Sequence, residues 1–501
     1  MQIHTDVKHK ALNHMSKVRR NIVISFTCLV MFVLLAGCYR MRASKGGGEI
    51  GPVGARKLVP SDVQLMPGYQ IEVVATDLTF PSALTFDDKG TLYVVEAGYV
   101  YGEKWEEPRL IRIADGVKTI VAKGGKNGPW NGVAFHNGNF FVSEGGELEG
   151  GRILRISPSG EMTVIAANLP SQGDHHTNGL VVKDGYIYFG QGTATNSAVV
   201  GTDNADFGWL KRKKDFHDIP CRDVVLSGRN YQSLNPLTDD PKDEVTTGAF
   251  VPFGTVTSPG QVIKGSVPCT GAIMRVPVSG GEIEMTSWGL RNPFGLALSP
   301  EGKLYVTENA YDERGSRPVW GAGDVLWEVK QDTWYGWPEF SGAKAIPDNA
   351  EFKPPAGDKV DAVLQNHPQR PPDPVTEFGV HSSANGFDFS HSAAFGFEGE
   401  AFVALFGDMA PNVGKVMAPV GFKVVRVNVE TGVVRDFAVN KGKRHGPATF
   451  VGSGGLERPV AVKFSPDGRS LYVVDFGILR MTDKGPDAMK SSGSIWRIEK
   501  K

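Results

Sequence analysis

The chain has 501 residues, 41% of them hydrophobic, with 54 Lys and Arg against 55 Asp and Glu and a formal net charge of −1. That length and apolar content suffice for one large core, and the near-zero charge gives no electrostatic basis for nucleic-acid binding. With 62 Gly and 32 Pro, the composition favours many short strands joined by turns over long helices.

The N-terminus has the pattern of an export signal. Basic residues precede the apolar run NIVISFTCLVMFVLLAGC, which ends at Cys38. This is a basic region, an apolar region and a small-residue processing site, and LAGC resembles the bacterial lipobox, whose cysteine is lipidated. We expect a signal peptide over residues 1–38 and an exported, membrane-anchored bacterial lipoprotein; an uncleaved single-pass anchor is the alternative.

Residues 39–66 contain ASKGGGEIGPVG and are predicted to form a flexible tether. From residue 67 to 501 one pattern recurs: a polar turn, a short apolar strand, a turn with Asp, Asn or Gly, and a second strand. The copies begin at Pro81, Asn131, Asn178, Asn292, Asn385 and Arg458.

The repeats predict an all-β fold, a six-bladed β-propeller with long loop insertions at about 203–270 and 311–380. Their spacing begins near the roughly 40 to 50 residues of a propeller blade. A β-sandwich or two small β domains would not explain six copies of one hairpin pattern.

A propeller brings the turns before its inner strands to one mouth of a central channel. Three of these turns carry His175, Arg291 with Asn292, and Arg458. A histidine with a pKa near 6.5 is a natural general base at neutral pH, and Asp174 stands next to it. Arg291, Arg458 and a lysine, Lys415 or Lys423, would suit a ligand with several carboxylates.

Two further features concern metal and disulfide chemistry. The segment TENAYDERGSRPVWGAGD, after the fourth inner hairpin, is rich in oxygen donors suited to Ca²⁺ but lacks EF-hand spacing. Cys221 and Cys269 lie in the exported part and are predicted to form a disulfide that closes a long inserted loop. Two separate buried thiols are the alternative.

Several motifs resemble the quinoprotein glucose/sorbosone dehydrogenase family, the soluble PQQ-dependent sugar dehydrogenases. They are GLRNPFGLA, TENAYDERGSRP, TWYGWP, DHHTNGL and ERPVAVKFSPDG, and the resemblance spans about residues 69–498. It implies a six-bladed propeller that binds pyrroloquinoline quinone (PQQ) and Ca²⁺ at its mouth and oxidises a small-molecule sugar or alcohol, with the electron acceptor left open.

The resemblance also implies roles for individual residues. His175 would take the substrate hydroxyl proton while hydride passes to the quinone, and Arg291 would lie beside the quinone oxygens. Asn292, Lys415 and Arg458 would contact the cofactor. The backbone carbonyls of Ala310 and Tyr311 would bind its calcium.

Three positions depart from the family pattern. Thr193 stands where an acidic residue orients the histidine, so Asp174 or a backbone carbonyl would have to do so. Phe294 replaces a polar residue, and Val325 replaces a carboxylate expected near a second calcium. Two rival functions stay open. The departures favour a non-catalytic module that binds sugars or proteins, and Glu96, Glu144 and Glu308, which end three inner strands, keep a metal-dependent lactonase as the other.

Overall fold

The structure is a computed structural model that describes residues 56–98, 105–146, 149–206, 208–347, 349–355, 357–367, 370–409, 419–482 and 485–501. All of them belong to one compact unit, Ser44–Lys501. The expected signal peptide and Cys38 lie outside the described residues. None of the helices in the described ranges is long and apolar enough to cross a membrane.

Six sheets share a core of four strands in antiparallel succession and make up most of the described chain; two of them have a fifth strand at the outer edge. The first three blades are β3 (Pro81–Phe86), β4 (Leu92–Glu96), β5 (Arg109–Ala114) and β6 (Val117–Lys123); β7 (Trp130–His136), β8 (Asn139–Glu144), β9 (Gly151–Ile156) and β10 (Met162–Leu169); β11 (Thr177–Lys183), β12 (Tyr186–Gln191), β17 (Ala272–Pro277) and β18 (Glu284–Trp288). The others are β19 (Asn292–Leu298), β20 (Leu304–Asn309), β21 (Gly323–Glu328) and β26 (Thr376–Val380); β27 (Ala384–Phe389), β28 (Ala401–Leu405), β29 (Lys423–Val427) and β30 (Val434–Asn440); β31 (Pro459–Phe464), β32 (Ser470–Asp475), β35 (Gly493–Lys500) and β2 (Tyr69–Leu78).

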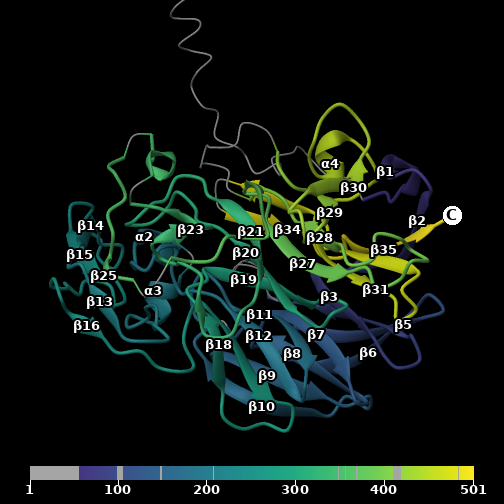
Figure 1. The fold of residues 1–501 in the computed structure, drawn as a ribbon, viewed down its shortest axis with the longest axis horizontal. Coiled ribbons are helices and arrows are strands. Elements are labelled where there is room, and N and C mark those ends of the chain that lie inside the picture. The colour runs from purple at the N-terminus through teal and green to yellow at the C-terminus, as the bar shows by residue number, and fades with distance from the viewer. Residues whose placement is uncertain are drawn as a thin grey trace, which may run out of the picture. The chain divides into compact units, whose positions relative to one another are not determined.

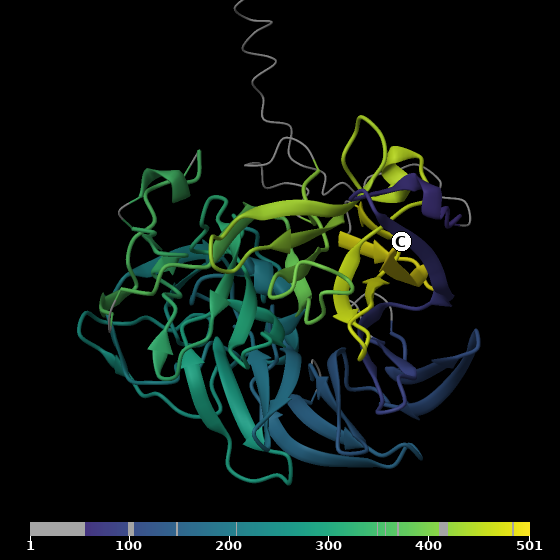
Figure 2. The same ribbon diagram turned by 45° about the vertical axis from the view of Figure 1, so that its right-hand side comes forward.

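The six sheets close into a ring (Figure 1). Each innermost strand packs against the next, in the order β3, β7, β11, β19, β27, β31 and back to β3. The sixth blade joins both ends of the folded chain, because β2 pairs with β35; Figure 2 shows the purple β2 beside the yellow C-terminal strands. The predicted all-β six-bladed propeller is confirmed.

Apolar side chains between neighbouring blades form the core. Strand β3 is buried along its whole length, as expected for an inner strand covered on both faces. The rings of Tyr93 on β4 and Phe140 on β8 lie 4.4 Å apart between the first two blades. Such contacts repeat around the ring and hold each inner strand in place.

An acidic residue at the end of the second strand fixes the turn that precedes the inner strand, which we call the leading turn. In the fourth blade, Glu308 accepts a hydrogen bond from the backbone N–H of Arg291 at 2.5 Å. In the sixth, Asp475 accepts one from the N–H of Arg458 at 2.9 Å, and in the first, Glu96 accepts one from Thr79 at 2.6 Å. In these three blades the buried carboxylates therefore have the same structural role.

The third blade carries a long insertion, residues 192–271 between β12 and β17, which we call the third-blade insertion. It holds α2 (Thr202–Asp206), α3 (Trp209–Arg212), β13 (Val224–Leu226), β14 (Asn230–Leu234), β15 (Glu244–Gly248) and β16 (Val262–Ile263), and lies at the left of the ring in Figure 1. The predicted disulfide is present: Cys221 and Cys269 are bonded, with Cα atoms 5.0 Å apart.

Two predicted boundaries need correction. The segment 311–380 is not one insertion, because β21 and β26 within it are blade strands that pair with β20 and with each other. The folded part also begins before residue 67: β1 (Val63–Leu65), within the predicted tether, pairs with β30.

The remaining elements are short and lie in connections. They are η1 (Pro60–Asp62), β22 (Thr333–Trp334), β23 (Phe340–Ser341), β24 (Lys344–Ala345), η2 (Ala350–Phe352), β25 (Leu364–Asn366), α4 (Ala448–Val451), β33 (Leu479–Thr482) and β34 (Gly485–Ala488).

Candidate active site

The leading turns of the third and fourth blades lie side by side. The backbone N–H of His175 donates to the carbonyl of Thr193 at 3.1 Å, and the N–H of Thr193 donates to the carbonyl of Arg291 at 2.9 Å. A side chain at Gly192 would overlap His175 and lie 3.3 Å from the Asn292 side-chain oxygen. The structure therefore brings His175, Arg291 and Asn292 together, as the propeller argument predicts.

The imidazole of His175 has a defined tautomer. Its Nδ1 lies 3.0 Å from the Thr193 carbonyl oxygen and 3.2 Å from the Thr193 hydroxyl. A carbonyl only accepts hydrogen bonds, so Nδ1 carries the proton and Nε2 carries the lone pair. Within the described chain, Nε2 has no hydrogen-bond partner. A backbone carbonyl, that of Thr193 itself, therefore orients this histidine in place of the acidic residue of the family pattern.

Burial, followed by the positive charges of Arg291 and Arg314, holds the pKa of His175 well below its usual value. The ring is therefore neutral at pH 7, with an available lone pair at Nε2. His176 points elsewhere, since its Nδ1 lies 3.0 Å from the Ser171 carbonyl oxygen and its ring packs on Trp209.

Arg291 is held from several sides and is 2% exposed. Its Nη2 donates to Asp312 Oδ2 at 2.9 Å, and its Nε to the side-chain oxygen of Asn196 at 3.1 Å. Burial opposes ionisation of Asp312, but Arg291 and Arg314 outweigh it and hold the pKa of that carboxyl well below its usual range. Arg291 therefore forms a buried ion pair within its own blade.

Asn292 belongs to a chain of side-chain amides across neighbouring blades. It accepts from Asn178 at 2.8 Å and donates to Asn309 at 2.9 Å. Asn309 in turn donates to the carbonyl of Ala384 at 2.9 Å. This chain links the third, fourth and fifth blades at the start of their inner strands.

The predicted calcium ligands follow β20. Asp324 Oδ1 accepts the N–H of Ala310 at 2.9 Å, and the Tyr311 hydroxyl donates to the Phe340 carbonyl at 3.0 Å. No donor in the described ranges reaches the backbone carbonyls of Ala310 or Tyr311, so both oxygens can serve a cation. The described residues contain no group of three His, Cys, Asp or Glu placed to hold a metal, and a calcium here would depend on carbonyls and ligand oxygens.

The other predicted cations do not join this cluster in the described part of the chain. Arg458 is 0% exposed; it donates to the carbonyls of Gly407 and Asp408, and its guanidinium lies 4.9 Å from the ring centroid of Phe422. Lys423 pairs with Asp436 at 2.6 Å on the outer strands of its blade. Lys415 lies outside the described residues.

Four residues of the site were not predicted as such: Asn196, Asp203, Asp312 and Arg314. Asp312 and Arg314 stand in the oxygen-rich segment that the sequence singled out as a possible metal loop. Asn196 and Asp203 lie in the third-blade insertion, where no repeat or spacing marks them. Phe294 and Val325, the departures from the family pattern, are apolar packing residues, with Val325 3% exposed.

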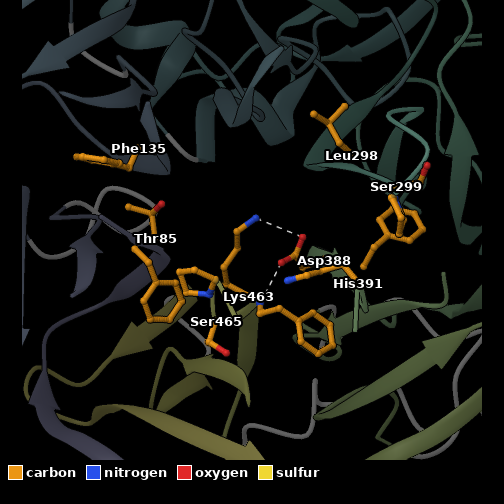
Figure 3. Close-up of a pocket in the computed structure, with 13 residues that line it drawn as sticks. Thr85, Phe135, Leu298, Ser299, Asp388, His391, Lys463 and Ser465 are labelled. Atoms are coloured by element: carbon orange, nitrogen blue, oxygen red, sulfur yellow. Dashed lines mark hydrogen bonds and ion pairs between the residues drawn. The ribbon is translucent and has the colours of Figure 1, made fainter. Parts of the chain in front are cut away.

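A cavity of about 370 Å³ lies at the other end of the channel, where the inner strands finish (Figure 3). Lys463 donates to Asp388 at 3.2 Å there, and Asp388 also accepts the N–H of Phe464 at 2.9 Å. His175 and Arg291 lie just before their inner strands begin, whereas Asp388 and Lys463 lie near the ends of theirs. The two sites are therefore distinct.

No protein-family model matches the chain, and no curated protein matches it in sequence. Solved structures match its fold. The calcium structure of a Trichoderma reesei enzyme of Carbohydrate-Active Enzymes Family AA12 is 14% identical, with a TM-score of 0.53 and coverage of 90% of this chain and 100% of that one. The holo form of the pyranose dehydrogenase PQQ domain from Coprinopsis cinerea is 14% identical, with a TM-score of 0.53 and coverage of 89% and 98%. The resemblance to quinoprotein sugar dehydrogenases is confirmed at the level of the propeller fold.

Proposed function

We propose that the protein is an oxidoreductase that oxidises a sugar or related alcohol or aldehyde with PQQ and Ca²⁺. The observation that carries the proposal is the neutral imidazole of His175, whose proton is fixed on Nδ1 and whose Nε2 is unpartnered within the described chain, beside the buried cation Arg291. A base and a fixed positive charge in one water-poor site suit removal of a hydroxyl proton. The PQQ named for the pyranose dehydrogenase domain supports the choice of cofactor.

The residues fit PQQ and its calcium on the side of His175. Arg291 and Asn292 would hold the cofactor, and the free carbonyls of Ala310 and Tyr311 would bind the cation. When bound, PQQ supplies the acceptor for the hydride that leaves the substrate carbon. His175 accepts the substrate hydroxyl proton at Nε2, and the Thr193 carbonyl stabilises the resulting imidazolium through Nδ1.

The fit is incomplete for the cofactor carboxylates, since Arg458 is buried against carbonyls and phenylalanine rings. This observation favours the second candidate, a propeller that binds a sugar or protein without catalysis. Lys415 remains part of the proposal as a carboxylate ligand. We further propose export and lipid anchoring through Cys38, on the strength of the N-terminal pattern alone.

The lactonase alternative loses its residues. Glu96 and Glu308 accept hydrogen bonds from leading turns, and Glu144 accepts one from Asn127 at 2.6 Å. The second oxygens are engaged as well, Glu308 with Trp327, Glu144 with Trp130 and Glu96 with Arg109, so each carboxylate already has a partner at both oxygens.

The test is reconstitution of the purified full chain with PQQ and Ca²⁺, followed by absorbance titration and dye reduction across a panel of sugars and alcohols. The proposal expects saturable PQQ binding and substrate-dependent dye reduction that EDTA abolishes. Sugar binding without dye reduction would establish the non-catalytic alternative.

A further inference from the structure

Arg314 lies where three segments of the chain meet. Its Nη1 is 2.6 Å from Asp174 Oδ2, in the leading turn of β11, and 2.7 Å from Asp203 Oδ2, in helix α2 of the third-blade insertion. Its Nε is 3.2 Å from Asp312 Oδ2, the same oxygen that pairs with Arg291. One guanidinium therefore connects the insertion to the neighbour of His175 and to the partner of Arg291.

The insertion and the segment after β20 are in close contact. Gly315 has φ +77°, and a Cβ there would lie 2.8 Å from Asp203 Oδ1; a Cβ at Gly201 would lie 2.6 Å from the Ser316 hydroxyl oxygen. Only glycine tolerates such an approach at both positions. The backbones of the insertion and of the segment after β20 therefore pack closely at these two glycines.

Asn196, also in the insertion, binds both sides of the same junction. Its Nδ2 donates to the carbonyls of Asp312 at 2.7 Å and Arg314 at 3.2 Å. Its Oδ1 accepts from the N–H of Asp312 at 3.0 Å and from Nε of Arg291 at 3.1 Å. These bonds fix the backbone that presents Asp312 to Arg291.

We propose that the third-blade insertion contributes to the active site. Asp203 and Arg314 are positioning residues that clamp residues 310–317. The clamp in turn holds the Asp312–Arg291 pair and the Asp174–His175 turn in place. The effect of this clamp on turnover rests on the proposed oxidoreductase function, whereas its effect on the backbone of residues 310–317 does not.

The chemistry of the cluster favours arginine at its centre. A planar guanidinium presents donors in several directions and can serve three carboxylates at once, whereas a lysine ammonium is a compact charge on a flexible stem. Of the three carboxylates around Arg314, Asp203 has the fewest partners, because its Oδ1 is buried without a hydrogen-bond partner. Burial raises its pKa to about 6 against the opposing effect of Arg314.

The first experiment measures the segment itself. Hydrogen–deuterium exchange is followed in the cofactor-free full chain for wild type, Arg314→Lys and Asp203→Asn. Arg229→Lys and Asp239→Asn, both exposed in the same insertion, are the matched controls. We expect Arg314→Lys to speed exchange across 310–317 by about tenfold or more and Asp203→Asn to speed it less, with β8 unchanged in both. Wild-type exchange in both site variants would overturn the clamp.

The second experiment uses the reconstituted enzyme. Arg314→Lys should lower kcat by roughly tenfold while KM stays within about threefold, with both controls at wild-type values. A variant with faster exchange in 310–317 and wild-type kcat would show that the clamp does not serve the site and would overturn that half of the inference. If wild type itself shows no turnover, the proposed function fails, and the exchange experiment still decides whether the clamp exists.

Discussion

The two ends of the channel are built differently. At the far end, the hairpin turns are short and nearly identical. In each, a backbone carbonyl accepts the N–H of the glycine three residues later, at 2.8 or 2.9 Å: Ser299 from Gly302, Ser465 from Gly468 and Asp87 from Gly90. At the other end, long connections from the third and fourth blades surround the buried Arg291 and the partly buried Arg314 with carboxylates. A propeller needs only short turns to close its blades, so the long, buried and charged end is where function is expected.

The charges at the two ends also differ in burial. The difference lies in the cations: the Arg291 side chain is 3% exposed beside Asp312 at 28%, whereas Lys463 at the far end is 42% exposed beside Asp388 at 11%. A largely exposed cation contributes little to stability, whereas replacing Arg291 breaks buried bonds to Asp312, Asn196 and the Asn309 carbonyl together. The comparison therefore predicts that equivalent substitutions at the two ends have unequal effects.

The largest effect is expected at His175. Replacing it with alanine removes the proton acceptor, and we expect kcat to fall by about 10³-fold, within the range for general-base catalysis. Steady-state dye reduction measures this, and the thermal midpoint should change little. Lys463→Met at the far end should keep wild-type kcat; a loss at Lys463 comparable to that at His175 would contradict the assignment of the site to one end.

Stability should separate the ends next. Arg291→Met leaves Asp312 partly buried with one partner fewer, and we expect the free energy of unfolding to fall by about 3 kcal/mol. For Lys463→Met the fall should be smaller, about 1 kcal/mol, because Lys463 is largely exposed and Asp388 keeps its hydrogen bond from the N–H of Phe464. Urea unfolding followed by fluorescence gives both values, and equal losses would show that the burial difference has no energetic weight.

Reducing the Cys221–Cys269 disulfide tests the insertion that supports the charged end. The bond joins residues 48 positions apart, and a loop of that length confers up to about 4 kcal/mol by restricting the unfolded chain. We expect Cys221→Ser with Cys269→Ser to lower the midpoint of insertion unfolding and to reduce kcat several-fold, less than Arg314→Lys. An unchanged proteolysis pattern in residues 192–271 would argue against this role.

The smallest expected effect is a slope with pH. Burial raises the pKa of Glu308 to about 7 and that of Asp218 to about 6, so in the native state these groups hold protons that the unfolded chain releases at lower pH. Between about pH 4 and 7 their contribution to the free energy of unfolding therefore falls as pH rises. Unfolding at pH 5 and 7.5 should show a flatter slope for Glu308→Gln than for wild type; an identical slope would contradict the shifted titration.

The fold followed from the sequence because each blade repeats a local pattern of strand, turn and strand. Its limits are equally physical. Strands β21 and β26 were missed as blade strands because long connections separate them, and β1 was assigned to a tether because its pairing partner lies in β30. Periodicity reports local structure and carries no information about strand pairs so far apart.

The site was partly predictable for a similar reason. His175, Arg291 and Asn292 occupy equivalent turns, so the ring symmetry alone placed them together. Asn196 and Asp203 act through contacts between two irregular connections, which no pattern encodes. Arg458 occupies an equivalent turn as well, but its side chain packs between phenylalanine rings, and turn position does not determine side-chain direction.

The pairing of β2 with β35 has a consequence for how the molecule comes into being. A chain emerging in order from its N-terminus can complete five blades locally, but the last sheet lacks its third strand until Gly493–Lys500 has been made. Until then β2 and β32 present unpaired edges, open to mispairing with other chains. Pairing of β35 with β2 and β32 therefore closes the ring. Removing β35 should leave an open, aggregation-prone arc of blades rather than a slightly smaller ring.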